Sequence, residues 1–417
     1  MLKRVTTSDI ELGMFIHKLE GSWFSHPFWK SKFLLDDPDM LASLRESNVD
    51  GVIIDVSRGN DVVERQQRTL ARAASAPAAI PPAALARPTF VRPPPTMPIT
   101  REFGRAKRTM GDALKVVGKT FIEARLGKAI NAQDVEPVID AIYASVQRNL
   151  YAFNGLLRCQ NGSEFIYRHS LAVSALMIAM ARHMKFAPLD IRDAGMAGLL
   201  MDIGVGQLPV DLSAVGSDYA QLPPDLKDQH VLLGCSFLKA AGDIPAPVIS
   251  AVLQHHERLD GSGYPHGISG GAIDRLSRMA AICDAYDTLA SSSGAGRGLD
   301  PAEAISILRA QPEKFDATLL EKLVETIGVY PVGAFVRMRS NRLAMVVDED
   351  PSDPLSPTVR TFWSIDLGKR LKGKTIMLAQ CFGEDAIEGI ADMNGFDAEE
   401  LDKLRESLLN SACREVS

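Results

Sequence analysis

The 417-residue sequence is poor in cysteine and contains no long hydrophobic run. Its five cysteines are scattered and form no CxxC pair, which argues against a disulfide framework or a zinc knuckle and is typical of reduced cytosolic thiols. The most apolar stretch, LAVSALMIAMARHMKF, meets Arg182 and His183 well short of the ~20 apolar residues that a membrane span needs. The first residues, MLKRVTTSDIELGM, lack the apolar core of a signal peptide. We therefore expect a cytoplasmic protein without a membrane segment.

An excess of positive charge is also missing. Lysine and arginine total 46 against 52 acidic residues, and the formal net charge is −6. Because DNA binding by counterion release needs clustered lysine and arginine, this balance predicts no DNA partner. At this length, and with 46% hydrophobic residues, the chain should form two or three units, each with its own core.

Composition divides the chain into four segments. Residues 1–58 predict a small α/β domain, with strand-like MFIHKL and DGVIIDVS on either side of the helix-like DPDMLASLRES. Residues 59–103 are rich in alanine and proline and predict a partly extended linker. Residues 330–417 predict a β hairpin or small sheet followed by an amphipathic helix. Residues 104–329 predict a helical bundle, which makes the protein mainly α; apolar spacing places its helices at about 105–127, 133–150, 163–185, 188–202, 225–241, 246–257, 273–291, 301–310 and 316–327.

Several histidines and aspartates of the helical segment are candidate metal ligands. Neutral imidazole and carboxylate suit a divalent ion such as iron or manganese, and facing helices of a bundle can bring such groups together. A single histidine on a helix is more often a satisfied polar residue, and Asp284 and Asp287 could instead be capping or surface charges. Adjacent histidines are harder to explain in that way, since both need polar partners if buried. The candidates are His169, Asp202, His230, His255, His256 and Asp284.

The segment HHERLDGSGYPHGISG, residues 255–270, strengthens the metal interpretation. Its glycines permit backbone conformations that other residues avoid, so the loop can lie close to a ligand and offer N–H groups to a phosphate. The candidate substrate-binding residues in it are Gly261, Gly263, Tyr264 and Pro265.

HHERLDGSGYP closely resembles the signature of the HD-GYP family, bacterial metal-dependent phosphodiesterases that hydrolyse the second messenger cyclic di-GMP to pGpG and often to GMP. The order of YRHS, the HD position, His230, HHE and AICDAYDTL also agrees with the family. The likeness covers roughly residues 118–329 and implies an HD-superfamily helical bundle. Residues 1–58 resemble the small domain of unknown function that often precedes HD-GYP.

The resemblance implies that all six candidate ligands bind one or two iron or manganese ions per chain. Asp202 would bridge the two ions and act at the catalytic centre, where activated water attacks phosphorus. Tyr264 would help to hold cyclic di-GMP or pGpG.

Two departures from the family pattern imply weakened activity. Met201 stands where the family has the histidine of its HD pair, and a thioether is too soft to replace imidazole on iron or manganese. The metal held by His169, Asp202 and Asp284 therefore keeps three protein ligands. The other metal keeps its complete set, Asp202, His230, His255 and His256.

The phosphate-binding side also departs from the family. The lysine that usually follows the HD pair is Val205, and the expected basic positions fall on Ser293 and Gly296, which leaves Arg297 as the nearby cation. A lost arginine removes a contact of about 1.5–3 kcal/mol. Phe165 occupies the place of a glutamate that holds a third metal in some members, so a trinuclear site is not expected.

The sequence leaves three functions open. The first is a cyclic di-GMP phosphodiesterase of reduced activity, and the second is an inactive receptor or adaptor in the same signalling. The third is a helical interaction protein in which the histidines are structural. A signalling partner such as a diguanylate cyclase domain, and a homodimer, are open alternatives.

Overall fold

The computed structural model describes residues 2–6, 10, 12–20, 32–35, 41, 51–59, 97, 99–158, 165–209, 224–291, 298–350, 353–381, 383–393, 396 and 398–415. The chain divides into two compact units, Met1–Ala78 and Ala79–Ser417, and each is described by itself. The domain boundaries expected near residues 58, 103 and 329 remain predictions.

The first unit contains an antiparallel four-stranded sheet in the order β1-β4-β2-β3. The two strands expected from the sequence are confirmed as β2 and β4, whereas the expected helix over DPDMLASLRES lies, apart from Leu41, outside the described residues. One face of the sheet buries a small apolar core around Ile16, Val52 and Ile54. The strands are β1 (Leu2–Val5), β2 (Phe15–Glu20), β3 (Phe33–Leu34) and β4 (Gly51–Asp55).

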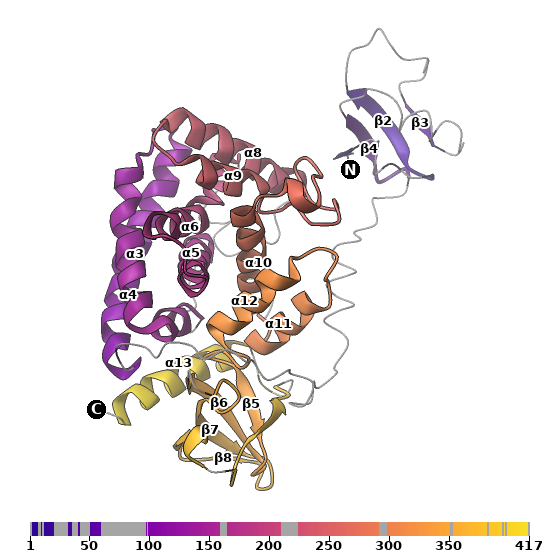
Figure 1. Ribbon diagram of the computed structural model, residues 1–417. Coiled ribbons are helices and arrows are strands. Elements are labelled where there is room, and N and C mark those ends of the chain that lie inside the picture. The colour runs from indigo at the N-terminus through magenta and orange to yellow at the C-terminus, as the bar shows by residue number, and fades with distance from the viewer. Residues whose placement is uncertain are drawn as a thin grey trace. The chain divides into compact units, whose positions relative to one another are not determined.

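The second unit is mainly helical, as the sequence predicts, with α5 and α6 at the centre of the bundle (Figure 1). The paired helices α3 and α4 pack on one side of them, and α10 packs on α5. The helices are α3 (Ile99–Arg125), α4 (Ala132–Arg158), α5 (Phe165–His183), α6 (Pro188–Leu200), α8 (Pro224–Ala241), α9 (Ala246–Gln254), α10 (Arg275–Ala290), α11 (Pro301–Arg309) and α12 (Ala317–Ile327), with short turns η4 (Ile203–Gln207) and η6 (Gly270–Ala272).

Helix α5 is buried on nearly every side, because its residues are apolar or small around the whole circumference. It packs so closely on α6 that a side chain at Gly198 would collide with the backbone at Ser174. The Ser174 hydroxyl donates to the Gly195 carbonyl at 2.8 Å. This contact fixes the end of α6, which leads directly into Asp202.

Helix α4 runs beyond its predicted end near residue 150, so that boundary was wrong. Asn149 leaves helical geometry, with φ −159° and ψ 106°. Its Oδ1 accepts from the backbone N–H groups of Tyr151 and Ala152 at 2.9 and 3.1 Å, which is the role of an N-cap. Asn149 therefore kinks the chain and starts a further helical stretch.

A C-terminal sheet and helix complete the second unit, and one continuous apolar core joins them to the helices. The strands form an antiparallel sheet in the order β10-β5-β6-β7-β8, with β9 paired to β7. Asp300 caps α11, and its Oδ2 also accepts from the Phe335 N–H at 2.8 Å. The predicted sheet and terminal helix are confirmed: β5 (Phe335–Met338), β6 (Arg342–Asp348), β7 (Thr358–Ser364), β8 (Lys369–Arg370), β9 (Thr375–Met377), β10 (Ile387–Ile390) and α13 (Ala398–Glu415).

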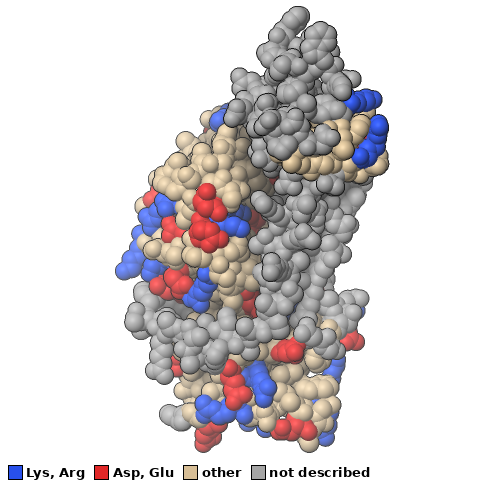
Figure 2. Space-filling model, turned by 90° about the vertical axis from the view of Figure 1, so that its right-hand side faces the viewer, with Lys and Arg blue, Asp and Glu red and all other residues tan. Residues whose placement is uncertain are grey.

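Two surface properties bear on the partners expected from the sequence. None of the described helices has both the length and the apolar character that crossing a bilayer would take. On the face drawn in Figure 2, acidic and basic side chains are interspersed over the described surface, and no continuous basic region forms there.

Candidate metal centre

Four of the predicted ligands meet at one buried point. Asp202 follows α6, His230 lies in α8, and His255 and His256 follow α9. One ligand atom from each lies within 4.8 Å of the others. Oδ1 of Asp202 is 3.1 Å from Nε2 of His230 and 3.7 Å from Nε2 of His255. We call these four residues the imidazole-rich half of the centre.

Close backbone packing positions the imidazole-rich half. A side chain at Gly204, in η4, would collide with the His230 carbonyl and with Gly234 in α8, so only glycine allows η4 and α8 to approach this closely. Asp202 and His230 are thereby brought within contact. His255 is held by a hydrogen bond from its Nδ1 to the Val252 carbonyl at 2.9 Å, which turns Nε2 toward Asp202.

The remaining two predicted ligands meet on the other side of Asp202. Nε2 of His169, in α5, lies 3.6 Å from Oδ2 of Asp202 and 3.1 Å from Oδ1 of Asp284 in α10. His256 connects the two groups, with its Nδ1 3.6 Å from Oδ2 of Asp284. His169, Asp202 and Asp284 are called the carboxylate-rich half. The structure thus brings all six candidates together.

A second aspartate orients His169. Nδ1 of His169 lies 2.8 Å from Oδ2 of Asp287, which leaves Nε2 facing Asp202 and Asp284. A histidine that binds a metal through one nitrogen almost always donates from the other to a carboxylate or carbonyl. The Phe165 ring stacks on His169 with the centroids 5.8 Å apart. Asp287 is thus a supporting residue that helical spacing alone left ambiguous.

Burial and neighbouring charges shift the pKa values of His169 and Asp202 in opposite directions, but they shift that of His256 in the same direction. Burial disfavours a charged His169, but its bonds to Asp284 and Asp287 outweigh burial and raise its pKa well above the usual value. Burial would raise the pKa of Asp202, yet contacts with His230 and His255 hold it well below the usual value. Burial lowers the pKa of His256, and the nearby His255 and His230 lower it further. The centre therefore keeps anionic carboxylates beside a neutral imidazole, which is a donor set for a cation.

The imidazole nitrogens of the imidazole-rich half are also arranged so that they could bind a cation. Nε2 of His256 is buried and has no hydrogen-bond partner among the described residues. Nε2 of His230 and Nε2 of His255 face each other at 3.3 Å, where a bound cation would accept both lone pairs. Buried polar atoms without partners are costly, so a cation at this point would relieve the cost.

The GYP loop lies beside the centre. The Tyr264 ring stacks on His256 with the centroids 4.6 Å apart, and the Tyr264 N–H donates to the His256 carbonyl at 3.3 Å. The peptide bond from Tyr264 to Pro265 is cis, and Gly261 adopts φ +77°, which glycine permits. Gly263 packs against the backbone of His256 and Glu257, where a side chain would not fit. Of the four predicted loop residues, Tyr264 and Gly263 therefore contact His256 directly, and Gly261 and Pro265 belong to the same loop.

Two further residues of the HHER motif support this loop, and neither was among the site residues predicted from the sequence. Glu257 is 1% exposed, and its Oε1 accepts from the His266 N–H at 2.8 Å. Arg258 donates from Nη1 to the carbonyls of His255 and Glu257 at 3.0 and 2.9 Å. The available sequence signal was a glutamate and an arginine directly after the histidine pair.

The departures from the family pattern can be placed only in part. Met201 ends α6 and is fully buried, as is Val205 in η4. Both lie on elements that carry or flank Asp202. Ser293, Gly296 and the predicted phosphate ligand Arg297 lie outside the described residues.

A helical bundle that brings histidines and aspartates to one buried centre is typical of a metal-binding helical domain. Comparison with known families supports this interpretation. Residues 158–319 match the model of the HD domain, and residues 2–135 match that of a domain of unknown function, DUF3391. The second match ends within α4, so it includes all of α3.

The relatives define the family more narrowly. Cyclic di-GMP phosphodiesterase PA4108 of Pseudomonas aeruginosa is 35% identical to this chain over 412 residues, covering 99% of this chain and 97% of that protein. Cyclic di-GMP phosphodiesterase PdeB of Borreliella burgdorferi is 22% identical over 192 residues, or 46% of this chain and 50% of that protein. The solved structure of Bd1817, an HDG"Y"P protein from Bdellovibrio bacteriovorus, aligns with a TM-score of 0.44 and 17% identity over 78% of this chain and 98% of that chain. The chain belongs to the HD-GYP family of HD-domain proteins, and its HD pair is Met201-Asp202.

Proposed function

We propose that this chain is a metal-dependent phosphodiesterase that hydrolyses cyclic di-GMP to pGpG or GMP, with activity weakened at one of two metal positions. The observation that carries the proposal is the approach of Asp202, His230, His255 and His256 to within 4.8 Å. The name and near-complete overlap of the Pseudomonas relative support the substrate.

The two halves of the centre would hold the metal unequally. Asp202, His230, His255 and His256 would bind one iron or manganese ion, and His169, Asp202 and Asp284 would bind a second ion more weakly. A bound divalent ion supplies Lewis-acid chemistry, since it acidifies water and offsets negative charge on a phosphate. Because Met201 offers a thioether where an imidazole would serve, one ion per chain is the expected content of the natural protein.

The chain's own residues provide the geometry for this reaction. Asp202 presents one oxygen to His230 and the other to His169, so it can serve both halves at once. The Val252 carbonyl and the Asp287 carboxylate fix the rings of His255 and His169 with Nε2 inward. Little reorganisation is then needed when a substrate phosphate arrives.

Substrate binding is assigned to the GYP loop. Tyr264 covers His256 with its ring, and burial raises its pKa well above the usual value, so it remains a neutral hydroxyl donor. Gly261, Gly263 and Pro265 let the loop backbone lie close to a phosphate. Arg297, the cation expected from the sequence, would bind the phosphate.

A receptor without hydrolysis is the second candidate, and the specific observation that favours it is Met201. A protein that held one ion could still bind a phosphate of cyclic di-GMP. It would lack part of the positive charge that stabilises the transition state of hydrolysis. The two candidates share the imidazole-rich half and differ in turnover.

Chromatography of the reaction products separates these candidates. Full-length protein is incubated with cyclic di-GMP and Mn²⁺, and pGpG and GMP are quantified, with Asp202→Ala as the blank and His266→Ala as the matched control for an exposed loop imidazole. We expect manganese-dependent pGpG that Asp202→Ala abolishes and His266→Ala retains. Binding of cyclic di-GMP without product would instead establish the receptor, and neither binding nor product would refute both.

A further inference from the structure

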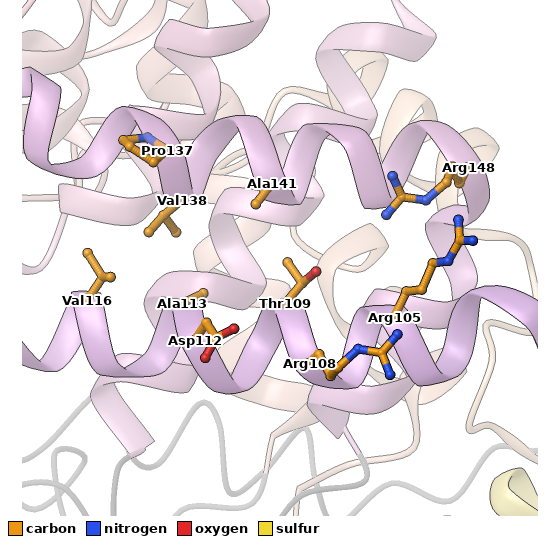
Figure 3. Close-up of a pocket in the computed structure, with 10 residues that line it drawn as sticks. All are labelled: Arg105, Arg108, Thr109, Asp112, Ala113, Val116, Pro137, Val138, Ala141 and Arg148. Carbon is orange, nitrogen blue, oxygen red and sulfur yellow. The ribbon is translucent and has the colours of Figure 1, made fainter.

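A groove of about 590 Å³ lies between α3 and α4 (Figure 3). This volume falls within the range of roughly 300–1,000 Å³ that is usual for small-molecule sites. The residues that carry the metal centre come from outside α3 and α4, and all of the residues that line the groove precede the segment that matches the HD domain. Its lining residues are Arg105, Arg108, Thr109, Asp112, Ala113, Val116, Pro137, Val138, Ala141 and Arg148.

Three guanidinium groups gather at one end of this groove. Arg105 extends from α3 toward Arg148 on α4, and Arg108 lies one turn further along α3 (Figure 3). Arg148 is fixed in place, since its Nε and Nη2 donate to the two oxygens of Glu102 at 2.6 and 2.8 Å. Glu102 is fully buried and also accepts from the Ser145 hydroxyl at 2.8 Å. One arginine of the cluster is therefore held by a buried network.

The arginine cluster is unusual for a solvated helix surface. Exposed arginines alone need no explanation, but like charges three or four positions apart on a helix repel each other. Arg105 and Arg108 are both exposed, and among the described residues neither is seen in an ion pair. The whole chain is acidic, with a net charge of −6. A bound anion would offset this local concentration of positive charge.

Beyond the arginines, the groove supplies a carboxylate one turn after Arg108 and then apolar side chains (Figure 3). Asp112 lies seven positions after Arg105, about 10.5 Å along the helix at 1.5 Å per residue. That is comparable to the span from the phosphate to the far edge of the base in a mononucleotide. Asp112 also accepts from Lys115 Nζ at 3.1 Å, but this pair is exposed and contributes little. Val116 and Val138 offer apolar contact for a ring.

We propose that this groove is a second nucleotide site that binds a guanine nucleotide with a free phosphate. Arg105, Arg108 and Arg148 hold the phosphate by charge-assisted hydrogen bonds. The Asp112 carboxylate accepts from the N1–H and the amino group of guanine, a donor pair that adenine lacks. The assignment does not depend on hydrolysis at the metal centre.

Calorimetric titration of the full-length protein with GMP, in EDTA so that metal-dependent binding is absent, tests this site. We expect GMP to bind at least about tenfold more tightly than AMP or guanosine. The double variant Arg105→Ala/Arg108→Ala should weaken GMP binding by at least about tenfold, since each charged hydrogen bond lost is large enough for that change. Asp112→Ala should bring the affinities for GMP and AMP together.

The matched control is Arg101→Ala/Lys107→Ala, which removes two exposed cations of α3 that do not line the groove. It should leave GMP affinity within about twofold, and an unchanged thermal unfolding curve verifies that the variants fold. GMP binding that the Arg105/Arg108 variant leaves intact would overturn the proposal, because the nucleotide would then bind elsewhere. Equal weakening by the control pair, or equal affinity for GMP and AMP, would also overturn it.

Discussion

Asp202 offers Oδ1 to His230 and His255 on one side and Oδ2 to His169 on the other, yet the two sides of the metal centre are completed differently. The imidazole-rich half gathers four potential ligands and leaves Nε2 of His256 without a described partner. In the carboxylate-rich half, His169 is already bonded to Asp284 and Asp287. The first arrangement leaves an imidazole nitrogen without a described partner, whereas in the second both ring nitrogens of His169 already have carboxylate partners.

This difference indicates where the loss of a ligand matters. If Met201 stands in place of a fourth ligand, as we propose, the carboxylate-rich half would offer a second ion only His169, Asp202 and Asp284. The imidazole-rich half keeps the stronger need for a metal. We therefore expect one tightly held ion per chain, and a substitution in the carboxylate-rich half should leave that ion in place.

The largest effect is expected from His255→Ala. Removing an imidazole that meets both Asp202 and His230 should reduce metal affinity by at least about 100-fold, beyond the 10–100-fold that losing a mere supporting contact costs. Inductively coupled plasma mass spectrometry should find the metal content falling from about one ion per chain to near zero. His266→Ala, in an exposed position of the adjacent loop, should keep the full content. Metal retained by His255→Ala would disprove the imidazole-rich site.

Met201→His should strengthen the carboxylate-rich half. A fourth ligand should raise the content from about one ion toward two per chain, with the second ion bound at least about tenfold more tightly than in the natural protein. Met201→Leu is the matched control, because it conserves volume without adding a ligand. Isothermal titration with Mn²⁺ measures both. If Met201→His behaves like Met201→Leu, position 201 does not serve the site.

Asp287→Asn should separate the two halves. The change weakens the acceptor that orients His169, so the second ion of the Met201→His protein should bind about tenfold more weakly. The first ion should be unaffected, because Asp287 contacts Nδ1 of His169, which belongs to the carboxylate-rich half. The same Mn²⁺ titration distinguishes these results, and equal loss of both ions would contradict the separation.

The pKa of Asp348, a half-buried carboxyl group far from the histidines in sequence, is shifted in the opposite direction to the pKa of Asp202. Burial raises the pKa of Asp348, at the end of β6, to about 6. The folded protein then binds more protons than the unfolded chain between about pH 4 and 6, so the Asp348 contribution to stability falls as pH rises through this window. Asp348→Asn should therefore stabilise the protein by about 1–3 kcal/mol at pH 7.5 and have little effect at pH 4.

Urea denaturation at the two pH values measures the Asp348 effect. Asp366→Asn, in an exposed turn, serves as the control and should change stability little at either pH. A gain from Asp348→Asn that is equal at pH 4 and pH 7.5 would show that ionisation of Asp348 is not its cause.

Much of the fold could be predicted from the sequence, because helices such as α5 and α11 carry strong local signals. The apolar circumference of α5 and the Asp300-Pro301 cap of α11 are both visible in the sequence. The continuation of α4 past residue 150 was missed, since Asn149 both interrupts and caps the helix. The mutual approach of the six ligands followed from a family resemblance and not from periodicity.

The finer geometry of the site depends on contacts that are distant in sequence. His169 and Asp287 are 118 positions apart, so helical spacing could not pair them. The approach of Gly204 to α8 likewise joins residues that only the folded chain brings together. The roles of Glu257 and Arg258 needed the direction of each side chain, which the HHER motif does not give.

Anomalous X-ray scattering at the manganese edge, from crystals of the full-length protein grown with Mn²⁺, tests the central claim most directly. We expect the strongest peak among Asp202, His230, His255 and His256, with a weaker peak or none beside His169 and Asp284. A strongest peak beside His169, or four separated side chains with no peak among them, would contradict it.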